Sequence, residues 1–381
     1  MNEHFNIENC IILLGFSLII IVSLAGNILV VRCLFVQSRL RKNSTNVLIG
    51  MLAISDLLMT TFNIPFTLVD IILHDWIFGT FFCTLVSFVQ ANSVYVSSFT
   101  MAVIAINRWR VVYRFRVRTN SASNNVRISS SGTENENSTH RLLLGGKQSL
   151  RCCWWRRSAS LSQTVEIEMA PVVTPALNTN QSISGSTIKL STGVRLMLVI
   201  FTIWLLAAAH SLPHTVFNKV VEHLYTNRTV RRCVPVFPPS LGKNVHLPLT
   251  IFTAVTQYFI PLSMAMAIYT RIGATILAQG KIGEMTRGRV EQLSKKKRRR
   301  ILMLVLIVTI FALCWLPFNV YYLLLDFGIT KQSNKSVFLV CLWLAMSSVC
   351  YNPFVYCWLN EHFQKEAKLV GQRIKSCLGI G

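Results

Sequence analysis

Two ionisable side chains stand in or beside long apolar segments of the sequence, where charge is costly. Asp56 lies in the stretch LAISDLL, deep within such a segment. An acid in this setting is by default a functional-site hypothesis, because an unpaired charge is expensive in hydrocarbon. Its expected companions are Ser97, Ser348 and Asn352. This cluster would hold a cation, with Na⁺ as the candidate, or a water network; a purely structural hydrogen-bond cluster is the alternative.

The second ionisable residue, Arg108, ends an apolar run and is preceded by an amide, Asn107, rather than an acid. Arg108 follows Cys83 by 25 residues, so a helix rising about 1.5 Å per residue separates them by about 37 Å. The two residues are therefore expected at opposite faces of a membrane. From spacing alone, an arginine in this place would simply extend to lipid phosphates.

The elements that position these residues are long apolar helices. The chain has 381 residues, of which 52% are hydrophobic and only 14% charged. A helix of about 20 residues crosses a hydrocarbon layer of about 30 Å. Seven segments meet that length, and together they predict an all-α membrane protein, a seven-transmembrane helix bundle: 11–36, 47–73, 82–107, 196–213, 247–278, 301–325 and 337–359.

Prolines interrupt five of these segments, at Pro65, Pro213, Pro261, Pro317 and Pro353. Proline is tolerated in membrane helices and introduces kinks about which helices can pivot. Kinked helices around a polar centre favour a protein that switches between conformations over one that conducts ions.

The distribution of positive charge predicts the orientation of the bundle. Of the 38 Lys and Arg residues, 31 fall in the segments assigned to one side and 7 in those assigned to the other. The positive-inside rule then puts the N-terminus outside the cell. The net charge of +23 is mostly this topological signal. A nucleic-acid partner is not expected, because the run KKKRRR at 295–300 stands at the boundary of a span.

The spans divide the chain into five parts. Residues 110–193 are rich in Ser, Asn and Thr, so this loop is expected to be disordered. Within it, RCCWWRR is either a membrane-surface anchor acylated at Cys152 or Cys153, or a sticky patch in a loop. The predicted parts are an extracellular tail (1–10), spans 1–3 (11–109), a cytoplasmic loop (110–193), spans 4–7 (194–359), and an amphipathic helix with a cytoplasmic tail (360–381).

The final part, 360–381, opens with a short helix that has Phe363, Ala367 and Val370 on one face. That face is expected to lie on the inner leaflet of the lipid bilayer. Cys377, at its end, is a candidate for acylation by palmitate.

Two of the eleven cysteines lie where oxidation is expected on this topology, Cys83 at the outer end of span 3 and Cys233 in the outer loop between spans 4 and 5. A disulfide between them would tie that loop across the mouth of the bundle. Asn227 and Asn334 begin outward-facing sequons and are candidates for glycosylation.

Several short motifs resemble the rhodopsin-like (class A) G-protein-coupled receptors. They are Gly26-Asn27, LAISDLL, the Cys83–Arg108 spacing, Trp204, Pro261, CWLP at 314–317 and NPFVY at 352–356. The resemblance covers every span and the short terminal helix, and leaves most of 110–193 uncovered. It implies a heterotrimeric G protein as partner, with arrestin and receptor kinases as further partners, and a plasma-membrane location.

The resemblance also implies which residues couple to the G protein and drive activation: Asn107, Arg108, Trp315, Pro317, Asn352, Pro353 and Tyr356. In the family, the arginine matched by Arg108 is held by an adjacent acid at rest, and reaches into the G-protein crevice on activation. Here the usual Asp-Arg-Tyr is Asn-Arg-Trp. An amide accepts a hydrogen bond less strongly than a carboxylate does, so the resting-state lock should be weaker.

The stretch 76–106 is similar to receptors for neuropeptide Y, neuropeptide F, RYamide and prolactin-releasing peptide. Thr67, Gln90, Gln257 and Asp326 match the ligand pocket of that group. Their ligands end in Arg-Phe-amide or Arg-Tyr-amide, which implies an acid for the arginine and amide and hydroxyl groups for the capped C-terminus. Gln90 replaces the acid of amine receptors, and Met346 replaces the lysine of opsins.

The sequence thus predicts a multi-pass plasma-membrane receptor for an extracellular neuropeptide. A rhodopsin-like receptor for a different ligand remains an alternative, and a transporter or channel a remote one, since that class predicts inverted repeats and intramembrane charges along a path. The protein is not expected to be an enzyme or to need a cofactor, because its soluble segments carry no nucleophile–base or metal-ligand set.

Overall fold

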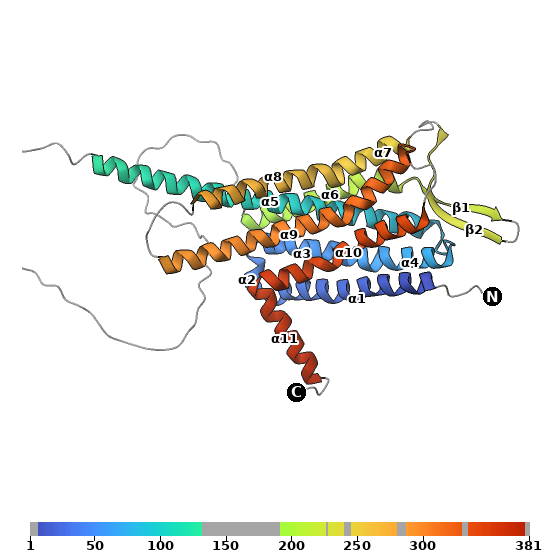
Figure 1. Cartoon of the computed structure of the whole chain (residues 1–381), viewed down its shortest axis with the longest axis horizontal. Helices are drawn as coiled ribbons and strands as arrows, with labels where there is room; N and C mark the ends of the chain where they lie inside the picture. The colour runs from blue at the N-terminus through green and yellow to red at the C-terminus, as the bar shows by residue number, and fades with distance from the viewer. Residues whose placement is uncertain are drawn as a thin grey trace, which may run out of the picture. The chain divides into compact units, whose positions relative to one another are not determined.

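The computed structural model describes residues 7–131, 191–225, 228–239, 245–279, 287–329 and 334–377 (Figure 1). Residues up to Arg118 and from Ser191 onward form one compact unit, to which all the elements below belong except the far end of α5. The elements are α1 Ile7–Val36, α2 Ser38–Arg41, α3 Ser44–Leu58, η1 Met59–Asn63, α4 Ile64–Leu73, α5 Gly79–Ser131, α6 Thr192–Thr215, β1 Asn218–Tyr225, β2 Arg228–Pro235, α7 His246–Thr253, η3 Ala254–Phe259, α8 Ile260–Gln279, α9 Arg287–Asp326, α10 Lys335–Leu359 and α11 Glu361–Cys377.

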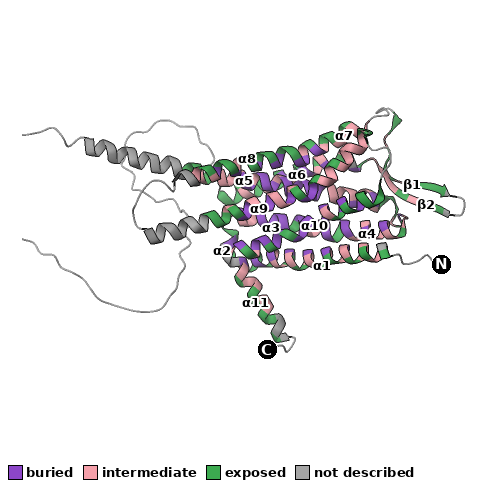
Figure 2. Cartoon of the chain, viewed as in Figure 1, coloured by how far each residue is buried: buried purple, intermediate pink, exposed green. Residues whose placement is uncertain are grey.

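Within the described residues, seven helical runs are long and apolar enough to cross a membrane, which confirms the predicted fold class. They lie side by side, with buried residues on their facing sides and exposed apolar residues on the outside (Figures 1 and 2). Exposed apolar side chains on the periphery are what contact with lipid tails requires. The runs are Asn9–Val36, Ser44–Leu73, Gly79–Arg114, Thr192–Pro213, His246–Ile276, Arg298–Asp326 and Lys335–Leu359.

The second and fifth spans each contain a π-helical turn, η1 and η3, with a proline shortly after it. Pro65 comes two residues after the end of η1, and Pro261 two residues after the end of η3. Proline has no N–H and its ring collides with the carbonyl four residues earlier, so a widened turn relieves both problems. Each π turn carries an amide side chain, Asn63 or Gln257, toward α5.

The first and seventh spans approach each other closely because Gly26 has no side chain. A Cβ on Gly26 would lie 2.7 Å from Cβ of Pro353. The neighbouring Asn27 uses this proximity to donate a 3.0 Å hydrogen bond from Nδ2 to the backbone oxygen of Val349. The Gly26-Asn27 pair of the sequence is thus a contact between α1 and α10.

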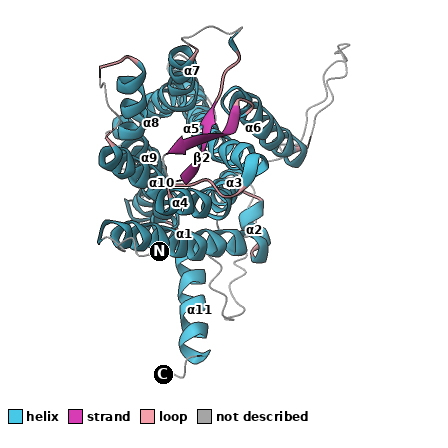
Figure 3. Cartoon of the chain, turned by 90° about the vertical axis from the view of Figure 1, so that its right-hand side faces the viewer, coloured by secondary structure: helices cyan, strands magenta, loops and turns pink. Residues whose placement is uncertain are grey.

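An antiparallel hairpin, β1–β2, lies across one end of the bundle (Figure 3). We call this the hairpin end. Cys233 of β2 forms the predicted disulfide with Cys83 of α5, and the Trp76 N–H donates to the Arg231 oxygen at 2.9 Å. An aromatic and apolar cluster seals the junction between hairpin and bundle: Phe66, Trp76, Phe78, Phe82, Val86 and Val220. The hairpin strands were not predicted from the sequence.

The structure corrects the start of the predicted loop 110–193. Helix α5 continues to Ser131, so residues 110–131 are helical rather than disordered. No glycine or proline occurs between Asn107 and Ser131, and nothing in the local sequence stops the helix of span 3. The rest of the loop, including Cys152 and Cys153, lies outside the described residues.

Helix α11 follows the seventh span as predicted, but its apolar face is not simply turned toward lipid. Phe363 is only 1% exposed and its ring centroid lies 5.9 Å from that of Tyr356. Ala367 and Val370 are half-buried. Gln37, after α1, donates a 2.7 Å hydrogen bond from Nε2 to Glu366 of α11. The helix is therefore anchored to the bundle through its first turns.

Candidate functional site

Asp56 is at the centre of a buried polar network. It is only 5% exposed, and its Oδ2 accepts a 2.9 Å hydrogen bond from Nδ2 of Asn352 in α10. A buried carboxylate needs such a partner, because desolvation is otherwise uncompensated. The hydrogen bond joins the second span to the seventh at the asparagine of the NPFVY stretch.

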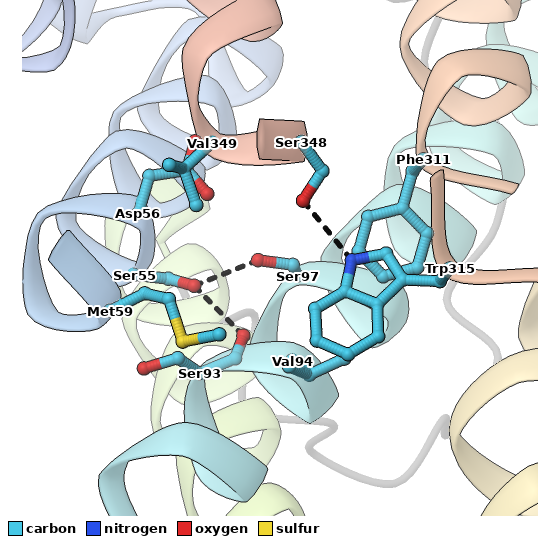
Figure 4. Close-up of a pocket in the computed structure, with 10 residues that line it drawn as sticks. All are labelled: Ser55, Asp56, Met59, Ser93, Val94, Ser97, Phe311, Trp315, Ser348 and Val349. Carbon is cyan, nitrogen blue, oxygen red and sulfur yellow. Dashed lines mark hydrogen bonds between the residues drawn. The ribbon is translucent and has the colours of Figure 1, made fainter. Parts of the chain in front are cut away.

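Beside Asp56 lies a small cavity with room for about one water molecule. Figure 4 shows the side chains that line it: Ser55, Asp56, Met59, Ser93, Val94, Ser97, Phe311, Trp315, Ser348 and Val349. The Ser55 and Ser97 hydroxyls are 2.8 Å apart, and Trp315 Nε1 donates to Ser348 Oγ at 3.1 Å. The structure thus brings Asp56, Ser97, Ser348 and Asn352 together, as the sequence predicted. One carboxylate with several hydroxyls is a donor set that suits a small hard cation or water.

The polar network extends from Asp56 toward the first span. The backbone oxygen of Asp56 accepts from the Thr60 hydroxyl at 2.7 Å, and that hydroxyl lies 2.6 Å from Ser23 Oγ. Asn27 Nδ2 donates to Ser23 Oγ at 3.1 Å. Three spans are therefore linked through polar side chains in the centre of the bundle. Thr60 and Ser23 were missed in the sequence because small hydroxyl residues are common in spans.

Trp315 of the CWLP stretch connects α9 to this network. Its ring packs against Phe311 and Phe318, with centroids 5.9 and 5.8 Å away, and its Nε1–H is the donor to Ser348 of α10. Pro317, two residues later, lies inside α9. A helix that pivots at this proline would have to break or carry with it the Trp315–Ser348 hydrogen bond.

Arg108 lies in α5 at the end of the bundle opposite the hairpin, with its Nε buried and without a hydrogen-bond partner. Within the part of the chain that the structure describes, Arg108 forms no hydrogen bond or ion pair, including with Asn107. Its electrostatic neighbours are Arg300 of α9 and Tyr269 of α8. Tyr269 also interacts electrostatically with Tyr356, which is buried in α10. Among the described residues, the electrostatic neighbours of Arg108 are therefore a cation and a phenol, with no acid.

The four predicted ligand residues lie on four different spans. Thr67 of α4 is half-buried, and Gln90 of α5 accepts a 2.9 Å hydrogen bond at Oε1 from Asn63 Nδ2. Gln257 of η3 is only 8% exposed and donates from Nε2 to the backbone oxygen of Ala91 at 3.2 Å. Gln257 is thus brought to the turn of α5 that carries Gln90.

The fourth residue, Asp326, is the last residue of α9 and is half-buried. Its Oδ2 accepts a 2.5 Å hydrogen bond from the Thr250 hydroxyl of α7. Thr250 was missed in the sequence analysis. No local pattern marks it, because the contact depends on how α7 and α9 meet at their ends.

Asn63 is a second residue that the sequence analysis missed. It ends η1, is fully buried, and stands four residues before Thr67. Residues four apart share a face of a helix, so the spacing to Thr67 was the signal that could have identified it.

Two other acids lie near the hairpin end. Asp75 forms an ion pair with Arg231 at 2.8 Å and also accepts from the Arg231 backbone N–H at 2.7 Å. The hydrogen bonds from Arg231 hold the pKa of Asp75 below its ordinary value, and they raise the pKa of Arg231. Asp70 of α4 has an Oδ1 that is buried without a partner among the described residues. Both carboxylate oxygens of Asp75 are thus occupied by contacts with Arg231 of the hairpin.

The predicted modification sites are only partly described. Asn334 is exposed, and its side chain accepts hydrogen bonds from the backbone N–H groups of Ser336 and Val337 at the start of α10. Asn227 lies outside the described residues. Cys377 is the last residue of α11, and its side chain is outside the description as well.

Comparisons with known proteins agree with this architecture. A family model described as the seven-transmembrane receptor (rhodopsin family) matches residues 26–130 and 186–356. The chain is 27% identical over 363 residues to the tachykinin-like peptides receptor 99D of Drosophila melanogaster, covering 93% of the chain but only 56% of that relative.

Neuropeptide Y receptors are similar over more of their own length. The chain is 24% identical over 390 residues to neuropeptide Y receptor type 6 of Mus musculus, which covers 97% of the chain and 84% of the relative. It is 26% identical over 362 residues to neuropeptide Y receptor type 1 of Xenopus laevis, covering 93% and 78%. With seven spans, the buried Asp56–Asn352 contact and the family match over most of its length, the chain belongs to the rhodopsin family of seven-transmembrane receptors.

Proposed function

We propose that this protein is a plasma-membrane receptor for an extracellular neuropeptide with an amidated C-terminus, and that it signals through heterotrimeric G proteins. The hairpin end is the extracellular end and the N-terminus lies outside, because the strongly basic segments are at the opposite end. The names of the relatives support a peptide ligand, and the matching pocket residues support an Arg-Phe-amide or Arg-Tyr-amide terminus.

The observation that carries this proposal is the pair of amides held at one turn of α5. Gln90 and Gln257 are each fixed by one hydrogen bond, to Asn63 and to Ala91. Polar groups that are held in place at the mouth of an apolar bundle give orientation and specificity to a ligand. At the outer end of α9, Asp326 supplies the carboxylate that an arginine recognises by two parallel hydrogen bonds.

At the other end of the bundle, Arg108, Tyr269 and Tyr356 form the region to which the G protein binds. Activation moves α9 about Pro317, and the contact between Trp315 and Ser348 transmits the change from the ligand site to the polar network around Asp56. A ligand can drive this change only by its differential affinity for the two arrangements.

The test is a screen of peptides ending in Arg-Phe-amide and Arg-Tyr-amide against cells that express the receptor, with G-protein activation as readout. Asp326→Ala should then weaken binding of the active peptide by about 2–5 kcal/mol, because a partly buried arginine loses its partner. Asp70→Asn, an acid at the same end, is the matched control. A peptide with citrulline in place of arginine should be insensitive to Asp326→Ala.

Two results would contradict the proposal. If no amidated peptide activates the receptor, the ligand class is wrong. If Asp326→Ala weakens the citrulline peptide as much as the native one, the receptor still binds peptides but Asp326 is not the partner of the arginine.

A further inference from the structure

A histidine and a lysine join the second and seventh spans at the hairpin end. His74 directly follows the second span, Lys335 begins the seventh, and Nζ of Lys335 lies 3.1 Å from Nε2 of His74. We propose that this contact is a proton-sensitive switch: protonation of His74 releases Lys335 and leaves the imidazolium to interact with Asp70 instead. The inference goes beyond the proposed function, because it does not depend on which ligand the receptor binds.

The contact with Lys335 exists only while His74 is neutral. A lysine ammonium has hydrogen-bond donors and no acceptor, so Nε2 of His74 must supply a lone pair and the imidazole proton must be on Nδ1. Protonation of Nε2 removes that lone pair, and the two cations then repel each other. Because histidine ordinarily titrates near pH 6.5, a moderate fall in extracellular pH is sufficient to charge it.

The backbone conformation of His74 is unusual for a residue with a side chain. His74 ends α4 with φ 54° and ψ 26°, the left-handed conformation, and its N–H donates to the backbone oxygen of Asp70 at 3.0 Å. Glycine is the usual residue at such a helix end, because a Cβ is disfavoured there. Among the described residues, His74 is the one non-glycine residue with a positive φ. The chain thus carries an imidazole where glycine would fit the backbone better.

A carboxylate is available to the charged form of His74. Asp70 stands four residues earlier, and the two side chains interact electrostatically. Oδ1 of Asp70 is buried and has no hydrogen-bond partner in the described part of the chain. The C-terminal end of a helix also favours a cation, and His74 is at that end of α4. A protonated His74 therefore gains Asp70 and the carbonyl end of α4 as it loses Lys335.

The beginning of α10 responds in the opposite sense. The N-terminal end of a helix carries a partial positive charge, so a lysine in the first turn is unfavourable unless its ammonium reaches an acceptor elsewhere. For Lys335, neutral His74 is such an acceptor. A second positive charge beside this turn would weaken it, together with the 3.0 Å hydrogen bond from the Phe338 N–H to the Asn334 oxygen. Acid is therefore expected to loosen the start of the seventh span.

The described charged groups that interact with His74 or with its neighbours come from α4, α10, β2 and the segment after α4: Asp70, Lys335, Arg231, Arg232 and Asp75. Lysine and arginine keep their charge in mildly acidic solution. Hydrogen bonds from Arg231 hold the pKa of Asp75 below its ordinary value, so Asp75 stays ionised there as well. Asp70 is the other group whose titration has to be distinguished from that of His74, and a substitution does so.

The experiment measures hydrogen–deuterium exchange in residues 335–340 of the ligand-free receptor in lipid nanodiscs. The rates are compared between about pH 7.5 and about pH 5.5 after correction for the intrinsic effect of pH. In the wild type, protection should fall about threefold in acid, since the loss of one exposed polar contact changes the opening equilibrium only modestly. His74→Gln keeps an acceptor that does not titrate and should abolish the difference. His74→Arg is permanently charged and should show low protection at both pH values.

Three further variants identify the groups involved. Lys335→Gln removes one of the two cations, so it should also abolish the dependence on pH. Asp70→Asn should move the fall in protection to lower pH, because the imidazolium loses its carboxylate. His223→Gln is the matched control, since His223 is an exposed histidine of the hairpin, and it should keep the wild-type dependence.

Three results would overturn the switch. Wild-type protection that is equal at both pH values would mean that no proton acts on this contact. A fall that persists in His74→Gln and disappears in Asp70→Asn would assign the titration to Asp70. Wild-type protection in His74→Arg at neutral pH would show that a charge at this position does not weaken the start of α10. None of these results bears on the peptide ligand, and a failed peptide screen would leave the switch unaffected.

Discussion

The hydroxyl of Thr250 donates a 2.5 Å hydrogen bond to Oδ2 of Asp326, and so joins the start of span 5 to the last residue of span 6. The proposed arginine-binding carboxylate is therefore not a freely solvated helix-end acid. Its rotamer is set by a neighbour on another helix, and binding of a guanidinium would find one of its oxygens already oriented.

We expect Thr250→Val to weaken binding of an arginine-containing peptide about three- to tenfold, which corresponds to the loss of about 0.7–1.4 kcal/mol from one hydrogen bond. Thr250→Ser should restore most of the affinity. Radioligand competition at matched surface expression measures the effect. Thr270→Val removes a hydroxyl that donates to the Met266 backbone, and it should leave peptide affinity unchanged. An equal loss for the citrulline peptide would show that Thr250 does not act through Asp326.

Asn107→Asp should lower signalling in the absence of ligand. The structure gives Arg108 no acidic partner among the described residues and sets Arg300 near it instead. A new carboxylate beside Arg108 should favour the resting arrangement, and each 1.4 kcal/mol of preference reduces the active fraction about tenfold. Basal G-protein activation at equal expression is the measurement. Asn107→Leu, which adds no charge, should resemble wild type; a similar drop in both variants would speak against an electrostatic lock.

The cavity beside Asp56 predicts that the affinity for agonists depends on the sodium ion concentration. A cation held by Asp56, Ser97 and Ser348 would stabilise the present arrangement of the spans, so it must oppose any ligand that prefers another one. Replacing Na⁺ by N-methylglucamine should raise agonist affinity about two- to tenfold in the wild type and have no effect in Asp56→Asn. Ser347→Ala is the control, because Ser347 bonds Leu344 outside the lining. Persistence of the sodium effect in Asp56→Asn would place the cation elsewhere.

The ion pair between Asp75 and Arg231 predicts how hairpin docking depends on pH. Hydrogen bonds from Arg231 hold the pKa of Asp75 below its ordinary value of 3.8. The stabilisation is therefore fully present above that value and is lost only as the pH falls through the lower pKa of the folded form. Docking should be unchanged in neutral and mildly acidic solution.

Hydrogen–deuterium exchange at Trp76 reports on this docking, since its N–H donates to Arg231. Normalised exchange should be flat from about pH 5 to 8 in the wild type, and faster throughout that range in Arg231→Gln. Lys219→Gln, an exposed charge change on β1, should leave protection intact. Equal protection in Arg231→Gln and wild type would mean that the disulfide and the aromatic cluster hold the hairpin without the ion pair.

The fold and the centre of the site could be predicted because each depends on a strong local signal. Seven apolar runs of sufficient length define seven spans, and one acid inside a span marks a polar centre without knowledge of the packing. Asp56, Ser97, Ser348 and Asn352 meet as expected because they lie at similar depths on helices that face the same core. The disulfide was predictable from topology, since Cys83 and Cys233 were the cysteines expected in an oxidising setting.

The contacts at the mouth could not be predicted in the same way. Whether Asn63 meets Gln90, or Thr250 meets Asp326, depends on the rotation of each helix about its axis, and apolar runs exposed to lipid carry little information about rotation. The π turns add to this, since each offsets the residues beyond it. The two strands of the hairpin are adjacent in sequence and pair with each other, whereas the docking of the hairpin on the bundle depends on Cys83 and the Trp76 cluster, which are distant in sequence.

The two π turns also divide their spans into halves whose rotation about the helix axis can change independently. A residue added to an α-helix turns everything beyond it by about 100°, so η1 and η3 set the outward halves at their own angle to the core. Removing one residue from η1 would restore a regular helix there and rotate Thr67 away from the proposed ligand site, while Asp56, which precedes η1, kept its place. On the proposed function, small shifts in helical phase would change what the mouth of the bundle recognises while the polar network around Asp56 stays as it is.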